Sequence, residues 1–137
     1  IMREMNIAMT VNFYNDYHND YCIKTIRHCI NKANRRLFGR QHKHIKGIGY
    51  VEGQSNKHLH LALHCPLKLA NHFHQLVLNE LVNKVPSIST YWKKNFGKQA
   101  KSTPIKIDPL CGTQNIIGWN RYSSKQQTTQ FDNSFVI

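Results

Sequence analysis

Residues 58–65 alternate histidine with apolar side chains over most of their length, and this pattern sets the strongest limit on the fold. Successive side chains of a β-strand point to opposite faces, so a strand here directs its leucines one way and its histidines the other. A helix would instead pair His60 with His64, but Pro66 follows too soon for an independent helix. Because the leucine face must be covered by another layer, the pattern predicts a sheet with packed elements.

A second β-like run, Lys46–Glu52, precedes this strand, and the polar residues 53–57 between them predict a hairpin. With a five-residue loop, Glu52 stands opposite His58 and Tyr50 stands opposite His60, all on one face. A four-residue loop would turn Glu52 to the other face. The loop length therefore decides whether a carboxylate joins the two imidazoles.

The remaining patterns predict three helices and two more strands. Apolar residues recur at helical spacing over Asp20–Leu37, and Gly39 follows as a stop. A second helix is expected over Pro66–Lys84, and a third over Thr113–Gln127. Strands are expected over Met5–Phe13 and Ile105–Ile107, while residues 87–101 carry no clear pattern. The order β, α, β, β, α, β, α predicts an α+β fold with a central antiparallel β-sheet and packed α-helices.

The charge of the chain points to a polyanionic partner. The 137 residues contain 19 Lys+Arg and 7 Asp+Glu, which gives a formal net charge of +12. Such a field attracts nucleic acid, and the length suits one domain over residues 1–137. We expect no membrane partner and an intracellular location, because no apolar run approaches the roughly 20 residues that a bilayer requires. Since Ile1 precedes Met2, a longer parent protein is also an expectation.

The four cysteines are expected to be reduced and buried. Cys22, Cys29, Cys65 and Cys111 include no C-x-x-C pair, and no secretion signal precedes them. A structural zinc site is therefore disfavoured.

The hairpin histidines are the best candidate metal ligands. Residues i and i+2 of a strand lie about 6.6 Å apart on one face, a gap that two imidazoles can close around a cation. With Glu52 opposite them, His58 and His60 would offer mixed nitrogen and oxygen ligation that suits Mn²⁺ or Mg²⁺. The alternative is that they are solvated histidines of an amphipathic strand. The pairs His42/His44 and His72/His74 lack a comparable setting.

A second candidate set lies near the C-terminus. Tyr122 and Lys125 are three residues apart and would share one face of the expected last helix, where the ammonium could approach the phenol or a phosphate. The alternative for Tyr122 is a half-buried helix aromatic.

Together, these motifs resemble those of the HUH superfamily of single-strand DNA endonucleases, and most closely the single-tyrosine rolling-circle replication initiators, or Rep proteins. The matching segments are TVNF at 10–13, GYVEGQSNKHLHLAL at 49–63 and IIGWNRYSSK at 116–125. The resemblance implies a central sheet flanked by helices in an RRM-like topology. It implies that His58, His60 and Glu52 bind the metal, that Tyr122 is the nucleophile and that Lys125 is its electrostatic partner.

The resemblance also implies an activity: metal-dependent, site-specific nicking and joining of single-stranded DNA through a 5′-phosphotyrosine, which initiates rolling-circle replication. A single-tyrosine HUH transposase and a non-catalytic basic nucleic-acid-binding module are the alternatives. The expected partners are origin or hairpin DNA, with a helicase domain or host replication proteins as further candidates. A monomer is favoured, and the location would be a bacterial cytoplasm or, for a virus, the host nucleus.

Basic and aromatic residues would supply the remaining contacts to DNA. The basic residues nearest the hairpin in the sequence are Arg35, Arg36, Arg40, Lys43, Lys46 and Lys57. They are expected to contact phosphates without reading sequence. Tyr50, Trp92 or Trp119 could stack on an unpaired base, although a core position is the favoured alternative for each.

Overall fold

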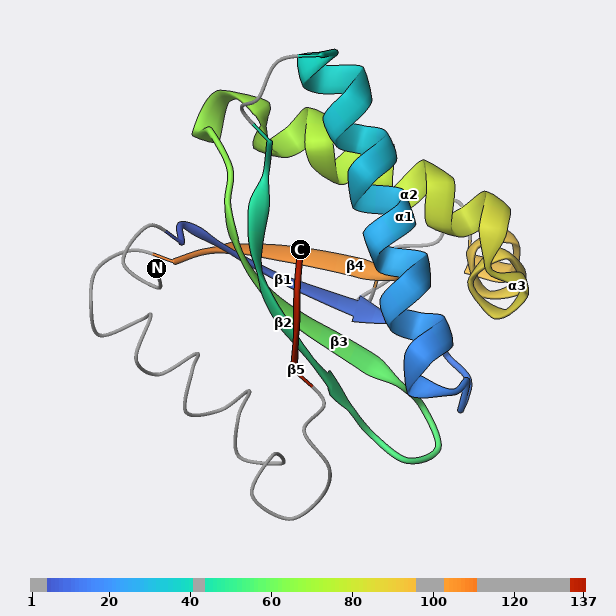
Figure 1. Ribbon diagram of the computed structural model, residues 1–137. Coiled ribbons are helices and arrows are strands. Elements are labelled where there is room, and N and C mark those ends of the chain that lie inside the picture. The colour runs from blue at the N-terminus through green and yellow to red at the C-terminus, as the bar shows by residue number, and fades with distance from the viewer. Residues whose placement is uncertain (1–4, 41–43, 96–102, 111–133) are drawn as a thin grey trace.

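The computed structural model describes residues 5–40, 44–95, 103–110 and 134–137, and these form an α+β fold (Figure 1). A single five-stranded antiparallel sheet has the order β4-β1-β3-β2-β5. The described elements are β1 (Ile7–Asn12), α1 (Asn19–Phe38), β2 (Lys46–Glu52), β3 (His58–His64), a short 3-10 turn (Leu67–Leu69), α2 (Ala70–Lys84), α3 (Pro86–Asn95), β4 (Ile105–Pro109) and β5 (Ser134–Val136). The first four strands with α1 and α2 follow the β-α-β-β-α-β order of the split βαβ motif. The predicted fold class is confirmed.

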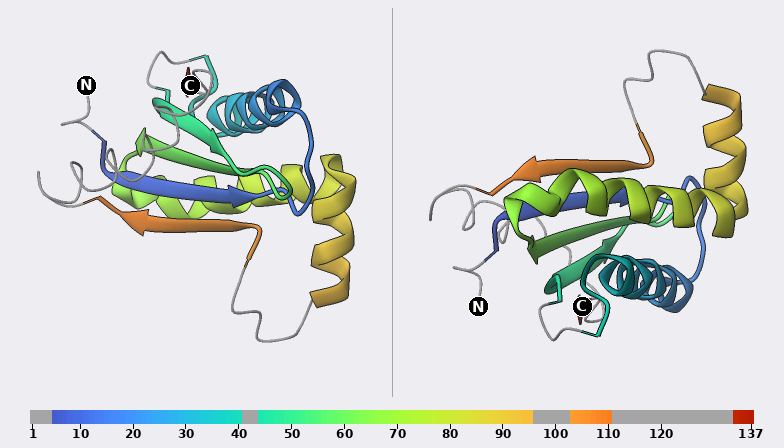
Figure 2. Two further views of the ribbon diagram at one scale, coloured as in Figure 1. Left: turned by 90° about the horizontal axis from the view of Figure 1, so that it is seen from below. Right: turned by 90° about the horizontal axis from the view of Figure 1, so that it is seen from above.

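One face of the sheet forms the main core. Leucines of β3 and the alternate residues Ile7, Met9 and Val11 of β1 are almost completely buried there. The apolar stripe of α1 and residues Phe73 and Val77 of α2 belong to the same buried cluster. Figure 2 shows these helices beside the strands in two opposite views, from below and from above. The other face of the sheet, to which the alternate residues of these strands point, is not covered by α1 or α2.

Helix α1 forms where the apolar periodicity predicts it. Its buried residues recur every three or four positions, and its basic residues lie on the other side. The His18 side chain accepts a hydrogen bond from the Asp20 N–H at the start of the helix, and Gly39 with a φ of 60° follows its end. A glycine adopts that left-handed conformation without a steric penalty.

Two elements differ from the sequence expectations. Residues 86–95, most of which fall in the segment 87–101 that carries no clear pattern, form α3, which begins at Pro86 one residue after Val85 caps α2. A proline fits the first turn of a helix, so Pro86 both ends one helix and begins the next. The C-terminal strand β5 was not expected; it pairs with β2, and its Phe135 ring lies over Gly49. The expected helix over Thr113–Gln127 lies outside the described residues.

The cysteine prediction is confirmed within the described residues. Cys22, Cys29 and Cys65 are buried free thiols, and burial raises their pKa to about 11, 12 and 11 respectively. Cys111 lies outside the described residues. At neutral pH these three thiols are protonated, so they are poor nucleophiles and poor metal ligands.

Candidate functional site

The candidate site lies on the face of the sheet opposite α1 and α2. The register confirms the five-residue loop: Glu52 pairs with His58, and Tyr50 pairs with His60. Because alternate residues share a face, all four side chains point away from the leucine core. The hairpin thus brings its carboxylate to the histidine face, as the sequence predicts.

A direct contact joins two of the predicted ligands. The His60 Nε2 atom lies 2.6 Å from the Glu52 Oε2 atom, and the two side chains are only 12% and 19% exposed. Such a distance fits a hydrogen bond in which the imidazole N–H donates to the carboxylate. The contact is diagonal, since Glu52 pairs directly with His58 and not with His60. Glu52 therefore fixes the orientation of the His60 ring.

His58 occupies the neighbouring position of the same face. It pairs with Glu52 on one side and with Asn12 of β1 on the other. Directly opposed residues have Cβ atoms about 4.5–5.5 Å apart, so the three predicted ligands occupy adjacent positions. Among the residues that the structure describes, however, no group of three or more histidine, cysteine, aspartate or glutamate side chains is arranged to hold a metal ion.

The donor set nevertheless fits a divalent cation chemically. Two imidazoles and one carboxylate are a common ligand set for first-row divalent metals. Glu52 and His60 already direct their donor atoms at each other, and a cation between them would need those atoms to separate. His58 would need to turn its ring toward the same point. A metal site would therefore require these side chains to rotate, whereas the strand register already places the three residues at adjacent positions.

Two residues of β1 extend this face and were missed by the sequence analysis. Thr10 pairs with His60 and Asn12 pairs with His58, so both border the histidines on the side away from β2. The Asn12 Oδ1 atom accepts a hydrogen bond from the Tyr14 backbone N–H at 2.8 Å. Strand alternation could have identified them: since Ile7, Met9 and Val11 point into the core, Thr10 and Asn12 must point to the opposite face.

The predicted nucleophile and its partner are not brought to the site by the described structure. Tyr122 and Lys125 lie outside the described residues, as do Trp119, Lys43 and His42. The roles assigned to Tyr122 and Lys125 therefore remain predictions.

The other residues singled out in the sequence lie in different settings. Trp92 on α3 packs against the main core, which confirms the core alternative for that residue. His74 on α2 places its ring nitrogen 3.4 Å from the Ile105 carbonyl oxygen, whereas His44 and His72 are exposed. Arg35 and Arg36 lie on α1, in the layer on the far side of the sheet from Glu52. None of these six residues borders the Glu52–His60 contact.

No helix among the described residues is both long and apolar enough to cross a bilayer. Comparisons of the chain with protein-family models, with curated proteins and with solved structures found no match. A function for this chain is thus inferred from its own residues and geometry, and stands as a proposal.

Proposed function

We propose that the chain nicks and rejoins single-stranded DNA, with Tyr122 as nucleophile and with Glu52, His58 and His60 as ligands of a divalent metal ion. The observation that carries the proposal is the hairpin register, which sets a carboxylate and two imidazoles at adjacent positions of one sheet face. The 2.6 Å contact between Glu52 and His60 adds to it. An amphipathic strand with merely solvated histidines does not require that carboxylate.

The chemistry asks little of the protein beyond positioning. A bound Mn²⁺ or Mg²⁺ would withdraw charge from a non-bridging oxygen of the scissile phosphate. The Tyr122 oxygen attacks phosphorus in line, the bond from phosphorus to the 3′ oxygen breaks, and the phenolic proton passes through solvent to the departing 3′ oxygen. The products are a 5′-phosphotyrosine and a free 3′-OH. Since one phosphoester replaces another, the reverse attack reseals the strand without a nucleotide cofactor.

The described ends of the segment that carries Tyr122 lie at the two edges of the sheet. β4 and β5 are its edge strands, and they run in the same direction because β4 is antiparallel to β1, β5 is antiparallel to β2, and β1 and β2 are both antiparallel to β3. The segment therefore begins and ends on the sheet that carries His58 and His60.

Chain length is compatible with the role proposed for Tyr122. Tyr122 lies twelve residues after Leu110 and twelve residues before Ser134, the two described residues that border the connection. Twelve extended residues span about 40 Å, more than the width of a five-stranded sheet at about 4.8 Å per strand. Ser134 itself pairs with Tyr50, in the same row of residues as His60. A tyrosine midway along the connection can thus reach the histidines.

The test is covalent trapping. The full chain, incubated with a pool of single-stranded oligonucleotides and Mn²⁺, should give a protein–DNA adduct that survives SDS. Tyr122→Phe should abolish the adduct and keep DNA binding, because only the nucleophilic oxygen is removed. Failure of the wild-type chain to form an adduct with either Mn²⁺ or Mg²⁺ would contradict the proposal.

The metal ligands are tested with a matched control on the same strand. His58→Ala, His60→Ala and Glu52→Gln should each lower adduct formation by about 10- to 100-fold or more, since replacing even the hydrogen-bond partners of metal ligands costs about that much. His64→Ala is the control, because His64 is exposed at the far end of β3 and pairs with Lys46. Equal loss in His64→Ala would show that these substitutions act through general damage to the strand.

A further inference from the structure

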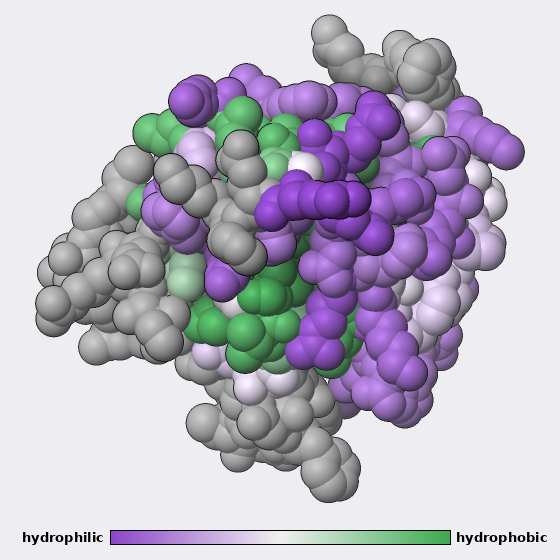
Figure 3. Space-filling view, turned by 45° about the horizontal axis from the view of Figure 1, so that its top comes forward, coloured by the Kyte–Doolittle hydropathy of each residue, from purple (hydrophilic) through white to green (hydrophobic). Residues whose placement is uncertain are grey.

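The outward side of α1 is a basic surface on the layer that lies behind the sheet. Its cationic residues are exposed, and hydrophilic side chains gather over this side of the molecule in the space-filling view (Figure 3). We call this set the α1 basic face: Lys24, Arg27, Lys32, Arg35 and Arg36. These residues span thirteen positions, a rise of about 18 Å along the helix.

Few of these charges are neutralised by neighbours. Lys32 bonds both carboxylate oxygens of Glu80 on α2, at 3.1 and 3.2 Å, and Arg27 donates to the Val136 carbonyl oxygen at 3.0 Å. Within the described parts of the chain, Lys24, Arg35 and Arg36 form no ion pair. The α1 basic face therefore keeps a net positive charge that can act on a partner.

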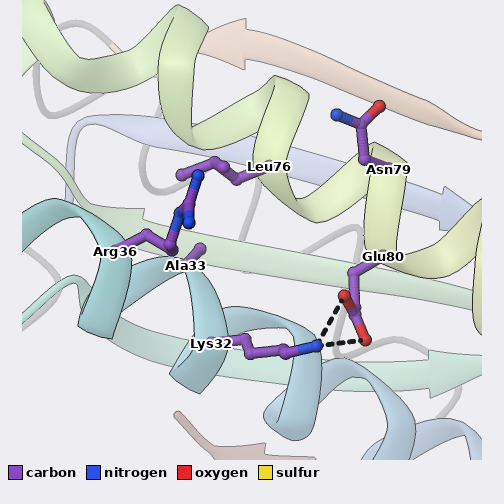
Figure 4. Close-up of a pocket in the computed structure, with 6 residues that line it drawn as sticks. All are labelled: Lys32, Ala33, Arg36, Leu76, Asn79 and Glu80. Carbon is purple, nitrogen blue, oxygen red and sulfur yellow. Dashed lines mark hydrogen bonds and ion pairs between the residues drawn. The ribbon is translucent and has the colours of Figure 1, made fainter.

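Two hollows flank the second half of α1. One, of about 250 Å³, lies between α1 and α2, and Figure 4 shows Arg36 and Lys32 on its α1 side with Glu80 across from them. The other, of about 310 Å³, lies on the opposite side of the helix and is lined by Asn31, Asn34, Arg35 and His44. Arg35 and Arg36 are consecutive, about 100° apart around the helix, so each serves a different hollow. The second half of α1 thus has a hollow on each side, with Arg36 and Lys32 at one and Arg35 at the other.

We propose that the α1 basic face binds duplex DNA, with α1 against a groove and with Arg35 and Arg36 on the phosphates of its two strands. A helix with side chains is about 10–12 Å across, and the major groove of B-DNA is about 12 Å wide. The two backbones that border such a groove would then follow the two hollows. Phosphate contacts of this kind give affinity and position without reading sequence.

The surface fits a duplex better than it fits the other polyanions. Single strands are commonly held by stacking on aromatic rings, and the exposed residues of α1 are polar or charged and include no phenylalanine, tyrosine or tryptophan. Membrane-surface helices insert apolar side chains, yet the large apolar residues that are strongly exposed in the described chain are Leu67 and Val136, neither of which is on α1. Duplex RNA is disfavoured because its major groove is deep and narrow.

This surface does not depend on the proposed nicking chemistry. α1 packs on the leucine face of the sheet, whereas Glu52 and His60 lie on the other face. Duplex binding by α1 can therefore be tested independently of the activity proposed for Tyr122.

The test compares two pairs of adjacent exposed cations. Arg35→Gln/Arg36→Gln removes two charges from the α1 basic face, and Lys93→Gln/Lys94→Gln removes two from α3. Binding of a labelled 20-base-pair DNA duplex is measured by fluorescence anisotropy from 50 to 200 mM salt. The arginine pair should lose about tenfold or more in affinity at 100 mM salt, and its salt slope should fall by about 1.8, as expected for two lost phosphate contacts. The lysine pair should stay within about twofold of wild type.

Several outcomes separate the alternatives. Equal loss in both pairs would overturn the proposal, since it would reflect net charge alone. Tighter binding of the wild type to a duplex RNA of the same sequence, or to vesicles with anionic lipids, would also overturn it. His60→Ala should bind duplex DNA like wild type even if it forms no adduct. A loss of duplex binding in His60→Ala would indicate that the duplex lies on the histidine face and would overturn the proposal. Thermal unfolding of each variant serves as the folding control.

Discussion

Asn34 joins α1 to the start of β2 through a two-way hydrogen bond with one buried residue. Its Nδ2 atom donates to the Ile45 carbonyl oxygen at 3.1 Å, and its Oδ1 atom accepts from the Ile45 N–H at 2.8 Å. Asn34 is 5% exposed and Ile45 is 1% exposed, so both bonds are largely shielded from water. Asn34→Ala leaves a buried N–H and a buried carbonyl unpaired, which should lower the free energy of unfolding by about 2–4 kcal/mol.

This loss is large for a domain with a typical stability of about 5–15 kcal/mol. For a chain of this length it corresponds to a fall in Tm of about 10 °C. Urea unfolding followed by circular dichroism measures the free energy, and Asn31→Ala is the control because Asn31 is exposed on the same helix. If the free energies of unfolding of the two variants differ by less than about 0.5 kcal/mol, the Asn34–Ile45 hydrogen bonds do not have the proposed effect on stability.

A second variant separates the two hydrogen bonds. Asn34→Asp keeps an acceptor for the Ile45 N–H but sets a carboxylate oxygen against the Ile45 carbonyl oxygen. Burial and this repulsion should raise the pKa of the new carboxyl above its ordinary value. The variant should therefore be most stable at low pH, where a protonated carboxyl can donate, and should lose stability as the pH rises through that pKa. Equal loss from wild type at pH 4 and pH 7 would contradict the bonding scheme.

Three further predictions concern the sheet and the core. Gly47→Ala should lower the free energy of unfolding by several kcal/mol and reduce soluble expression, because a Cβ there would overlap the Ala62 carbonyl oxygen of β3. A yield and a Tm equal to those of the wild type would refute this. Phe135→Ala should lower the free energy of unfolding by about 3 kcal/mol and remove hydrogen-exchange protection at the β2–β5 pairing, since Phe135 is only 6% exposed. Unchanged protection would show that β5 pairs with β2 without the Phe135 ring. Burial raises the pKa of Cys29 to about 12, so the stability that its buried thiol contributes is complete below pH 9 and is lost as the pH rises toward 12. Cys29 should therefore resist iodoacetamide at pH 8 in the native protein and react in urea. Labelling of Cys29 in the native protein would refute its burial.

The hairpin could be predicted because its signals are local. Alternation over residues 58–64 and the polar loop 53–57 together determine which residues share a face, and the observed register agrees at Glu52–His58. The helix α1 was equally accessible, since its buried residues follow one helical stripe. Both elements carry their pattern within one continuous stretch of sequence.

Elements that depend on distant partners were not predictable in the same way. β5 has three residues, and its place follows from β2, where the absence of a side chain at Gly49 makes room for the Phe135 ring. Arg27 of α1 lies over the same ring, 5.8 Å from its centroid. These contacts join residues far apart in the chain, and no local pattern reports them.

The site was predictable in register but not in side-chain detail. Strand pairing sets Glu52 opposite His58, yet the carboxylate bonds the diagonal neighbour His60. Rotamers decide between such neighbours, and backbone periodicity does not determine them. The polar border formed by Thr10 and Asn12 was implied by strand parity, although its proximity to the histidines required the β1–β3 pairing.

The central claim is that a phenolic oxygen near the C-terminus reacts with a phosphate held beside the hairpin histidines. Trapping the chain on single-stranded DNA with Mn²⁺, followed by proteolysis and mass spectrometry, tests it most directly. We expect a nucleotide 5′-phosphate attached to Tyr122, absent in His60→Ala and retained in His64→Ala. An adduct on another residue, or cleaved DNA with no adduct on the protein, would contradict it.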